Sequence, residues 1–238
     1  MNGGRRASLG VIFGIVLLDL IGFGILIPQL GVYGVRFHGS PFAVGLLLSV
    51  YSLMQLIFAP VLGRLSDRYG RRPVLLYSIA GSVAGYLLFA VADALPLLFL
   101  ARIIDGVSGG NIATAQAYVA DVTTDEDRVQ GMGMVGAAFG LGFLLGPGIG
   151  GFLGALGGNW AIGLGAASLG AVNWVLAFFF LPESRPAGTP TPAKRSRLQL
   201  AEPLRTPVVG RILLLFLLYG VAFAQMEGTF SIFVLSQH

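Results

Sequence analysis

Seven stretches of about 20 or more residues are almost wholly apolar, and they constrain this chain more than any other feature. They cover residues 9–32, 42–62, 73–92, 94–118, 129–156, 160–182 and 209–235. A helix of about 20 apolar residues spans the hydrocarbon core of a bilayer. Strands of a membrane barrel are far shorter and alternate apolar with polar residues, which these stretches do not. The sequence therefore predicts an all-α membrane protein.

Charged residues make up only 11% of the chain, whereas a soluble domain carries about 25%. All of the 15 lysines and arginines except Arg36 and Arg102 fall on one side of the predicted spans. This is the positive-inside distribution, so we expect a multi-pass protein of the plasma (inner) membrane with a cytoplasmic N-terminus. The basic pI of about 9.8 then reflects topology, and we expect no nucleic-acid partner.

The longest polar connection, residues 183–208, is rich in proline and basic residues and predicts a cytoplasmic linker. We expect a six-helix bundle over residues 1–182 before it and the first helix of a second bundle over 209–238 after it. A faint repeat relates the second span to the fifth, since Ala59-Pro60 and Gly146-Pro147 are each followed three residues later by glycine. Such inverted three-plus-three repeats occur in secondary transporters.

Ionisable residues inside spans are costly, at about 2.5–3.5 kcal/mol each near the bilayer centre, and they therefore indicate a protein interior or a water-filled cavity. Arg102 and Asp105 are three residues apart on one predicted helix and can pair locally, which allows a purely structural reading. Asp19 has no such local partner. Because buried carboxylates in membranes can exchange protons, we predict a proton-coupling group of Asp19, Arg102 and Asp105.

Other polar residues within spans are candidates to line a substrate cavity. Gln116 is expected on the same helical face as Asp105, and Glu227 has the alternative of extending to the membrane surface. The candidates are Gln55, Gln116, Gln225 and Glu227.

The fifth span contains glycines at four-residue spacing. This spacing lets two helices approach closely, and Pro147 removes one helical hydrogen bond. We therefore predict tight packing and a bend at a moving interface. The residues assigned to this bend are Gly142, Gly146, Pro147, Gly150 and Gly151.

The stretch "DVTTDEDR" at 121–128 admits a different class of function. Asp121, Asp125 and Asp127 are spaced as in membrane-bound prenyl-transfer enzymes, which hold magnesium and diphosphate with such acids. No second acidic cluster completes a site, so a solvated loop is favoured. We expect no metal, no cofactor and no enzymatic activity.

Several motifs resemble the major facilitator superfamily, in particular the twelve-helix drug/proton antiporters of the tetracycline-exporter group. The stretch "GRLSDRYGRRP" at 63–73 is similar to the loop signature between helices two and three, and "LDLIGFGILIPQL" at 18–30 to the first-helix signature. Four further stretches are similar to signatures of helices four to seven: "RIIDGVSGG" at 102–110, "GFLLGPGIGG" at 142–151, "LPES" at 181–184 and "YGVAFAQMEGTF" at 219–230.

The resemblance implies a conformational latch at the 63–73 loop. In it, Asp67 caps helices and Arg71 pairs with Asp121, locking the two halves while the transporter is open outward. The implied latch residues are Gly63, Asp67, Arg68, Gly70, Arg71, Arg72 and Asp121. A loop that serves only positive-inside topology would explain the arginines but not Asp67.

The resemblance also implies the function, a proton-coupled antiporter that exports amphipathic drugs such as tetracycline-like compounds. Its partners would be the drug, protons, the lipid bilayer and a missing C-terminal half, because the chain ends near its seventh span. A transporter of a sugar or other metabolite and an inactive fragment are the alternatives. Asp105 occupies a position that is often uncharged in related exporters, so its role is open.

Overall fold

The computed structural model describes residues 3–185, 208–215 and 217–220, with side chains from Ser8 onward. The chain forms two compact units, residues 1–189 and 190–238. The described residues of the second unit, 208–215 and 217–220, are helical and, apart from Arg211, largely apolar. The first unit consists of the helices α1 (Gly3–Arg36), α2 (Pro41–Tyr69), α3 (Arg71–Ala90), α4 (Leu95–Ser108), α5 (Asn111–Val122) and α6 (Arg128–Phe180).

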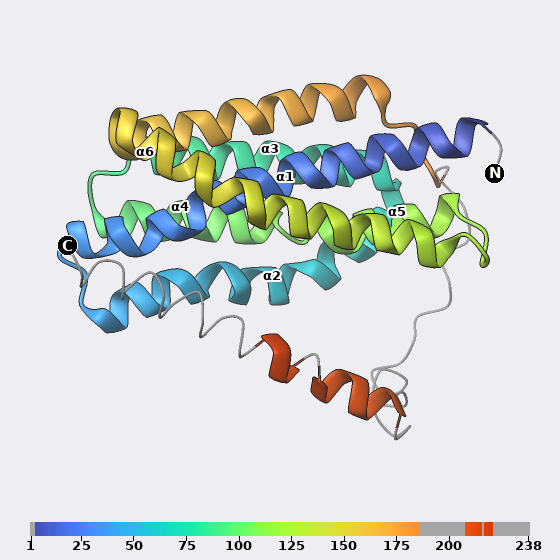
Figure 1. The fold of residues 1–238 in the computed structure, drawn as a ribbon, viewed down its shortest axis with the longest axis horizontal. Helices are drawn as coiled ribbons and strands as arrows, with labels where there is room; N and C mark the ends of the chain where they lie inside the picture. Colours follow the sequence, from blue (N-terminus) through green and yellow to red (C-terminus); the bar gives the residue numbers. More distant parts are fainter. Residues whose placement is uncertain (1–2, 186–207, 216, 221–238) are drawn as a thin grey trace. The chain divides into compact units, whose positions relative to one another are not determined.

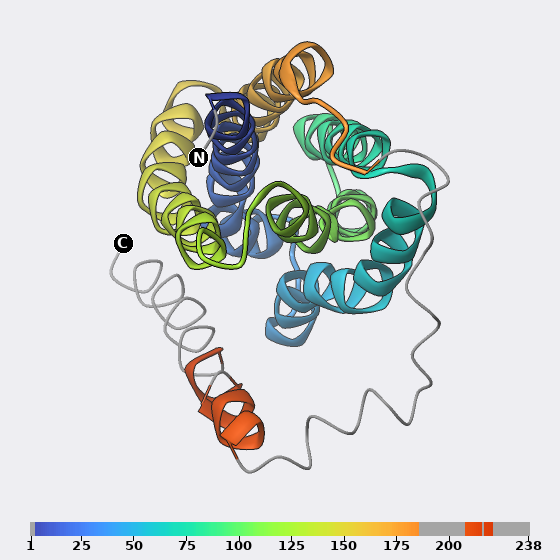
Figure 2. The same ribbon diagram turned by 90° about the vertical axis from the view of Figure 1, so that its right-hand side faces the viewer.

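The first unit is a bundle of roughly parallel rods, as the side and end views show (Figures 1 and 2). No strand occurs among the described residues, and the predicted all-α membrane class is confirmed. One end of the bundle, here called the charged end, carries residues 63–72, 121–128 and 181–185. The opposite end, here called the far end, carries the turns at 37–40, 91–94 and 157–158.

The predicted fifth and sixth spans are the two arms of α6, which folds back on itself. The backbone leaves helical geometry only at Gly157 and Gly158, and the φ of 63° at Gly158 favours glycine. The Nδ2 of Asn159 donates to the carbonyls of Ala90, at 3.3 Å, and Ala92, at 2.7 Å. These bonds join the turn of α6 to the turn between α3 and α4, so the sequence reading of two spans is correct.

The predicted fourth span contains a break that the sequence reading did not expect. The helices α4 and α5 meet at Gly109 and Gly110, and together they make one rod, Leu95–Val122, which is long and apolar enough to cross a membrane. A side chain at Gly110 would stand 2.9 Å from the Cα of Ala59, and one at Gly109 would contact the ring of Tyr51. The two glycines therefore let α2 pack directly against the break.

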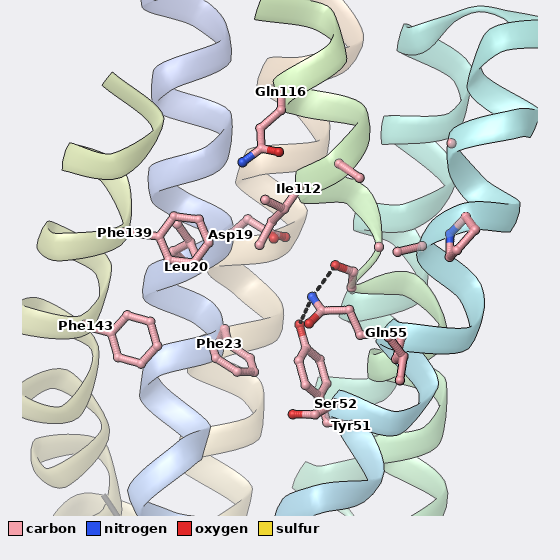
Figure 3. A pocket seen from close by; sticks show the side chains of 17 residues that line it. Asp19, Leu20, Phe23, Tyr51, Ser52, Gln55, Ile112, Gln116, Phe139 and Phe143 are labelled. Atoms are coloured by element: carbon pink, nitrogen blue, oxygen red, sulfur yellow. Dashed lines mark hydrogen bonds between the residues drawn. The ribbon is translucent and has the colours of Figure 1, made fainter. Parts of the chain in front are cut away.

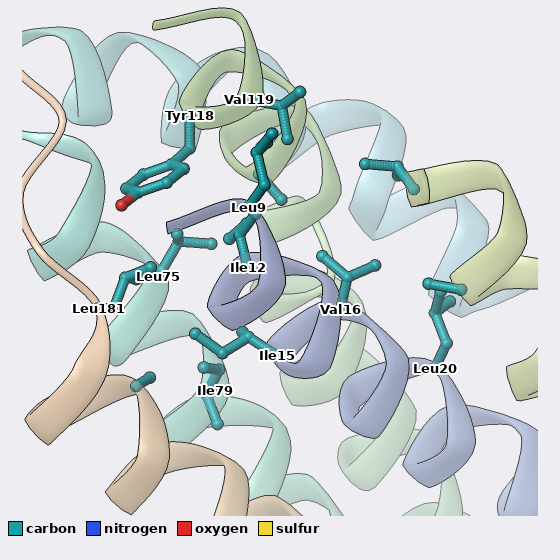
Figure 4. Packing of buried hydrophobic residues seen from close by; sticks show 14 residues of the cluster. Leu9, Ile12, Ile15, Val16, Leu20, Leu75, Ile79, Tyr118, Val119 and Leu181 are labelled. Carbon is teal, nitrogen blue, oxygen red and sulfur yellow. The ribbon is translucent and has the colours of Figure 1, made fainter. Parts of the chain in front are cut away.

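Helix α1 is the centre of the apolar core. Leu9, Ile12 and Ile15 of α1 lie among side chains of α3 and α5 (Figure 4). A second cluster toward the far end again uses α1, through Ile25 and Leu30, together with Phe89 and Ile162. Helix α2, in contrast, buries only 17% of its most apolar window within the chain.

Helix α1 crosses the first arm of α6 with direct backbone contact. A side chain on Gly146 would stand 2.6 Å from the Cα of Gly24, and one on Gly142 would stand 2.6 Å from the Cβ of Leu20. The predicted tight packing of these glycines is thus confirmed. The backbone stays helical through Pro147, and the predicted bend and movement stay predictions. Gly151 points away from this contact, with nothing within 4 Å of its added Cβ.

Most of the predicted linker and seventh span lies outside the described residues. This applies to Gln225 and Glu227, and to the whole motif 219–230 beyond Gly220. The predicted domain boundaries and the internal three-plus-three repeat stay predictions.

Candidate functional site

A cavity of about 900 Å³ opens in the first unit between α1, α2, the α4–α5 break and the first arm of α6. Its polar groups are few, and its wall is largely aromatic and aliphatic (Figure 3). The side chains that give it chemical character are Asp19, Phe23, Tyr51, Ser52, Gln55, Gln116, Phe139 and Phe143. The structure therefore brings Asp19, predicted for proton coupling, together with Gln55 and Gln116, predicted for the substrate cavity, around one space.

Asp19 lies halfway along α1 on the cavity wall. The Nδ2 of Asn111, the first residue of α5, donates to Asp19 Oδ2 at 2.9 Å. Sequence reasoning found no partner for Asp19, because Asn111 is 92 residues away. The sequence feature that could have indicated Asn111 is its position, since it is a polar residue directly after the Gly109–Gly110 pair within an otherwise apolar span.

Gln55 on α2 is held by two contacts across the wall. Its Nε2 donates to the Gly109 carbonyl at 2.7 Å and to the Tyr51 hydroxyl at 3.4 Å (Figure 3). The break between α4 and α5 thus supplies a backbone acceptor to the cavity wall. The amide of Gln55 is consequently positioned before any ligand binds.

Arg102 and Asp105 form a buried pair behind this wall. The Nη1 of Arg102 is 2.6 Å from Asp105 Oδ2, and the two side chains are 2% and 4% exposed. The guanidinium lies 4.3 Å from the ring centroid of Tyr51 and 5.5 Å from that of Phe23. Neither residue of the pair lines the cavity. Of the three residues predicted to act together in proton coupling, Asp19 therefore lies on the cavity wall, whereas Arg102 and Asp105 lie behind it.

The expectation that Gln116 shares a helical face with Asp105 is wrong. Gln116 lines the cavity, whereas Asp105 packs against α3, with its Cβ 3.1 Å from a Cβ built on Gly85. The prediction assumed one continuous helix, and the break at Gly109 and Gly110 separates the two residues.

At the charged end, Arg71 joins three segments. Its Nη2 is 2.7 Å from Asp67 Oδ1, its Nε is 3.0 Å from Asp121 Oδ2, and its Nη1 donates to Ser66 Oγ at 2.6 Å. Its side chain is only 7% exposed. The Arg71–Asp121 contact implied by the resemblance is thus present, while its role as a latch stays a prediction.

Asp67 does not cap a helix, which corrects the role implied by the resemblance. It lies inside α2 and pairs with Arg71 and with Arg185, whose Nη1 is 3.2 Å away. The start of α3 is capped by Glu183, whose carboxylate accepts from the backbone N–H of Arg71 at 2.8 Å and of Arg72 at 3.1 Å. Asp67 was assigned from its loop position, but α2 continues to Tyr69 and carries it within the helix.

The remaining predicted latch residues have separate surroundings. Gly70 has a φ of 101°, and a side chain there would collide with Glu183. The Nη2 of Arg72 donates to the Phe178 carbonyl at 2.5 Å. Arg68 stacks on the ring of Tyr69, and Gly63 lines the cavity.

The acidic stretch 121–128 makes mainly local contacts. Asp125 pairs with Arg128 at 2.9 Å, and Asp127 bonds to Thr124, while Asp121 turns toward Arg71 and Ser184. Within the described part of the chain, no group of three or more His, Asp or Glu residues is arranged to hold a metal ion.

The chain belongs to the major facilitator superfamily, whose sequence model matches residues 12–238. It is 44% identical over 180 residues to the class C tetracycline resistance protein of Escherichia coli, covering 74% of this chain and 45% of that protein. It is 41% identical over 188 residues to the class B protein of the same organism, covering 78% and 46%. The chain spans about half the length of these curated relatives.

Similar solved structures agree with this assignment. The human organic anion transporter MFSD10 (TETRAN) matches with a TM-score of 0.70 and 28% identity, over 88% of this chain and 55% of that one. A bacterial homologue of the human lysosomal transporter Spinster, 16% identical, shares the fold with a TM-score of 0.66. The resemblance drawn from the motifs is confirmed, and the family is one of transporters, so the prenyl-transfer alternative is set aside.

Proposed function

We propose that this chain is part of a proton-coupled antiporter that exports amphipathic drugs, such as tetracycline-like compounds, across the plasma membrane. The observation that carries the proposal is a cavity whose wall combines one carboxylate, Asp19, with aromatic rings and two amides. Such a wall suits a ligand with a flat apolar body and a few polar groups. The similarity to the tetracycline resistance proteins supports this substrate class.

Asp19 is the proposed coupling group. It lies in the membrane-spanning part of α1 and faces the cavity, so a proton and a substrate compete for the same carboxylate. The hydrogen bond from Asn111 keeps it on the wall in a fixed position. Arg102 acts on it from behind Tyr51 and Phe23 rather than by direct contact.

Alternating access requires a second bundle that rocks against this one around the cavity. We propose that the charged end of the first unit faces the cytoplasm. The contacts of Arg71 with Asp67 and Asp121 would break and form again as the bundles move, which makes them a conformational latch.

Everted membrane vesicles containing the gene product that carries residues 1–238 test this function. An imposed proton gradient should drive tetracycline into the vesicles and release protons in exchange. Asp19→Asn keeps the size of the side chain and should abolish gradient-driven uptake while the protein remains in the membrane. Asp93→Asn, at an exposed acid of the far end, is the matched control and should transport normally. Undiminished uptake by the Asp19→Asn variant would remove Asp19 from the mechanism.

The metabolite alternative is tested in the same vesicles. Unlabelled amphipathic drugs should compete with tetracycline uptake, whereas sugars at equal concentration should not. Competition by sugars alone would favour the metabolite transporter.

A further inference from the structure

The buried Arg102–Asp105 pair is the feature from which a further property follows. We infer that Asp105 is a positioning and charge-selecting residue, which makes the cavity prefer cationic amphiphiles by neutralising Arg102. This inference rests on the proposed function and names the charge class of its substrate. It also gives Asp105 a role different from the proton coupling predicted from the sequence.

The cavity wall by itself favours a cation. Its 17 described lining residues include one acid, Asp19, and no lysine, arginine or histidine. Phe23 and Tyr51 lie with ring centroids 4.7 Å apart, Phe143 meets Phe23 edge to face at 6.1 Å, and Phe139 stacks on Phe143 (Figure 3). The faces of aromatic rings carry partial negative charge, and a carboxylate carries a full negative charge. Both therefore attract a cation.

Arg102 is the described group that opposes this preference. Its guanidinium lies 4.3 Å from the centroid of Tyr51, a ring that itself belongs to the cavity wall. A ligand stacked on the cavity side of that ring would come within roughly 8 Å of the guanidinium, after adding a van der Waals contact of about 4 Å. Charges at that separation in a membrane interior are weakly screened, so an uncompensated Arg102 would repel a cationic ligand.

Asp105 removes that repulsion. Its Oδ2 is 2.6 Å from Arg102 Nη1, and burial of both side chains keeps the pair together. Close packing of Asp105 on Gly85, and of Gly106 on the Tyr51 backbone, fixes α4 against α3 and α2. The cavity therefore experiences a nearly neutral pair behind Tyr51, and the charge of Asp19 decides the sign of the site.

The test measures binding of two ions of matched shape and opposite charge, tetraphenylphosphonium and tetraphenylborate. The gene product that carries residues 1–238 is placed in lipid nanodiscs without a proton gradient, and binding to protein-free nanodiscs is subtracted. The readout is the ratio of the Kd for the anion to the Kd for the cation. Because no gradient is needed, a failure of proton coupling does not affect this readout.

Three variants separate charge from structure. Asp105→Asn leaves Arg102 uncompensated and should lower the ratio at least about tenfold, equivalent to about 1.4 kcal/mol. The double variant Arg102→Gln/Asp105→Asn removes both charges and should return the ratio to within about threefold of the original. If Asp105 had a purely structural role, the double variant would not restore the Kd ratio. Replacing the buried pair by neutral residues would then disturb packing without changing the charge near the cavity.

Arg102→Gln alone should not lower the Kd ratio. If the Asp105→Asn variant fails to fold, the Arg102→Gln variant provides the test instead. Anion preference in the unmodified protein would overturn the inference. So would an unchanged ratio in Asp105→Asn, a lowered ratio in Arg102→Gln, or a double variant that keeps the lowered ratio.

Discussion

The backbone N–H of Arg71 donates to Glu183 Oε1 at 2.8 Å, and this bond joins segments that are 112 residues apart in the chain. The first N–H groups of a helix have no partner within the helix, and an acceptor there stabilises it. The stretch "LPES" at 181–184 therefore closes the bundle by capping the start of α3.

Replacing Glu183 by alanine should remove this cap. We expect a loss of about 0.5–2 kcal/mol in stability, toward the lower end because Glu183 is exposed. Glu126→Ala, at an exposed acid of the 121–128 stretch, is the control and should change stability by less than about 0.5 kcal/mol. Thermal unfolding followed by fluorescence-detected size exclusion measures both, and equal melting of the two variants would contradict the cap.

The Arg71–Asp121 contact should be coupled in transport. Reversing either charge, as Arg71→Asp or Asp121→Arg, should impair export. The double reversal should recover only part, because the new aspartate at 71 would face Asp67. Reversal of the exposed pair Asp125 and Arg128 is the control and should have little effect. Strict additivity in the Arg71–Asp121 double-mutant cycle would mean that the two residues are not coupled.

The crossing of α1 and α6 should tolerate no side chain at Gly146. Gly146→Ala places a methyl group against the backbone of Gly24, and we expect a destabilisation of about 1–3 kcal/mol or loss of folded protein. Gly151→Ala lies in the same helix with open space around it and should be tolerated. Comparable yields and melting temperatures for the two variants would show that the crossing can relax.

The proposed orientation can be tested with single cysteines, because the chain has none. Asp93→Cys, in the far-end turn, should react with a membrane-impermeant maleimide in intact cells. Glu126→Cys, at the charged end, should react only after permeabilisation. The reverse labelling pattern would invert the topology.

The sequence predicts the helical rods well and their internal interruptions poorly. Apolar length and charge placement locate the first six spans, because these properties act along the chain. The break at Gly109 and Gly110 depends on where Tyr51 and Ala59 lie, which is a property of packing between helices. Gly157 and Gly158 were placed correctly between spans because the apolar stretch is too long for one crossing.

The candidate site shows the same limit. Asp19, Gln55 and Gln116 were identified because polar groups within spans are costly. Asn111, Glu183 and the stacking of Tyr51 on Arg102 were missed, since each depends on a contact between distant segments. The helix-capping role implied for Asp67 was wrong because α2 runs two residues beyond it.

The bonds from Asn159 to the turn between α3 and α4 have a consequence for the order of assembly. Domains are made from the N-terminus onward, so the carbonyls of Ala90 and Ala92 leave the ribosome well before Asn159, which follows Ala92 by 67 residues. The hairpin formed by the two arms of α6 is therefore attached to a turn that has already been synthesised. The last hairpin of the first unit therefore packs onto spans that were synthesised before it.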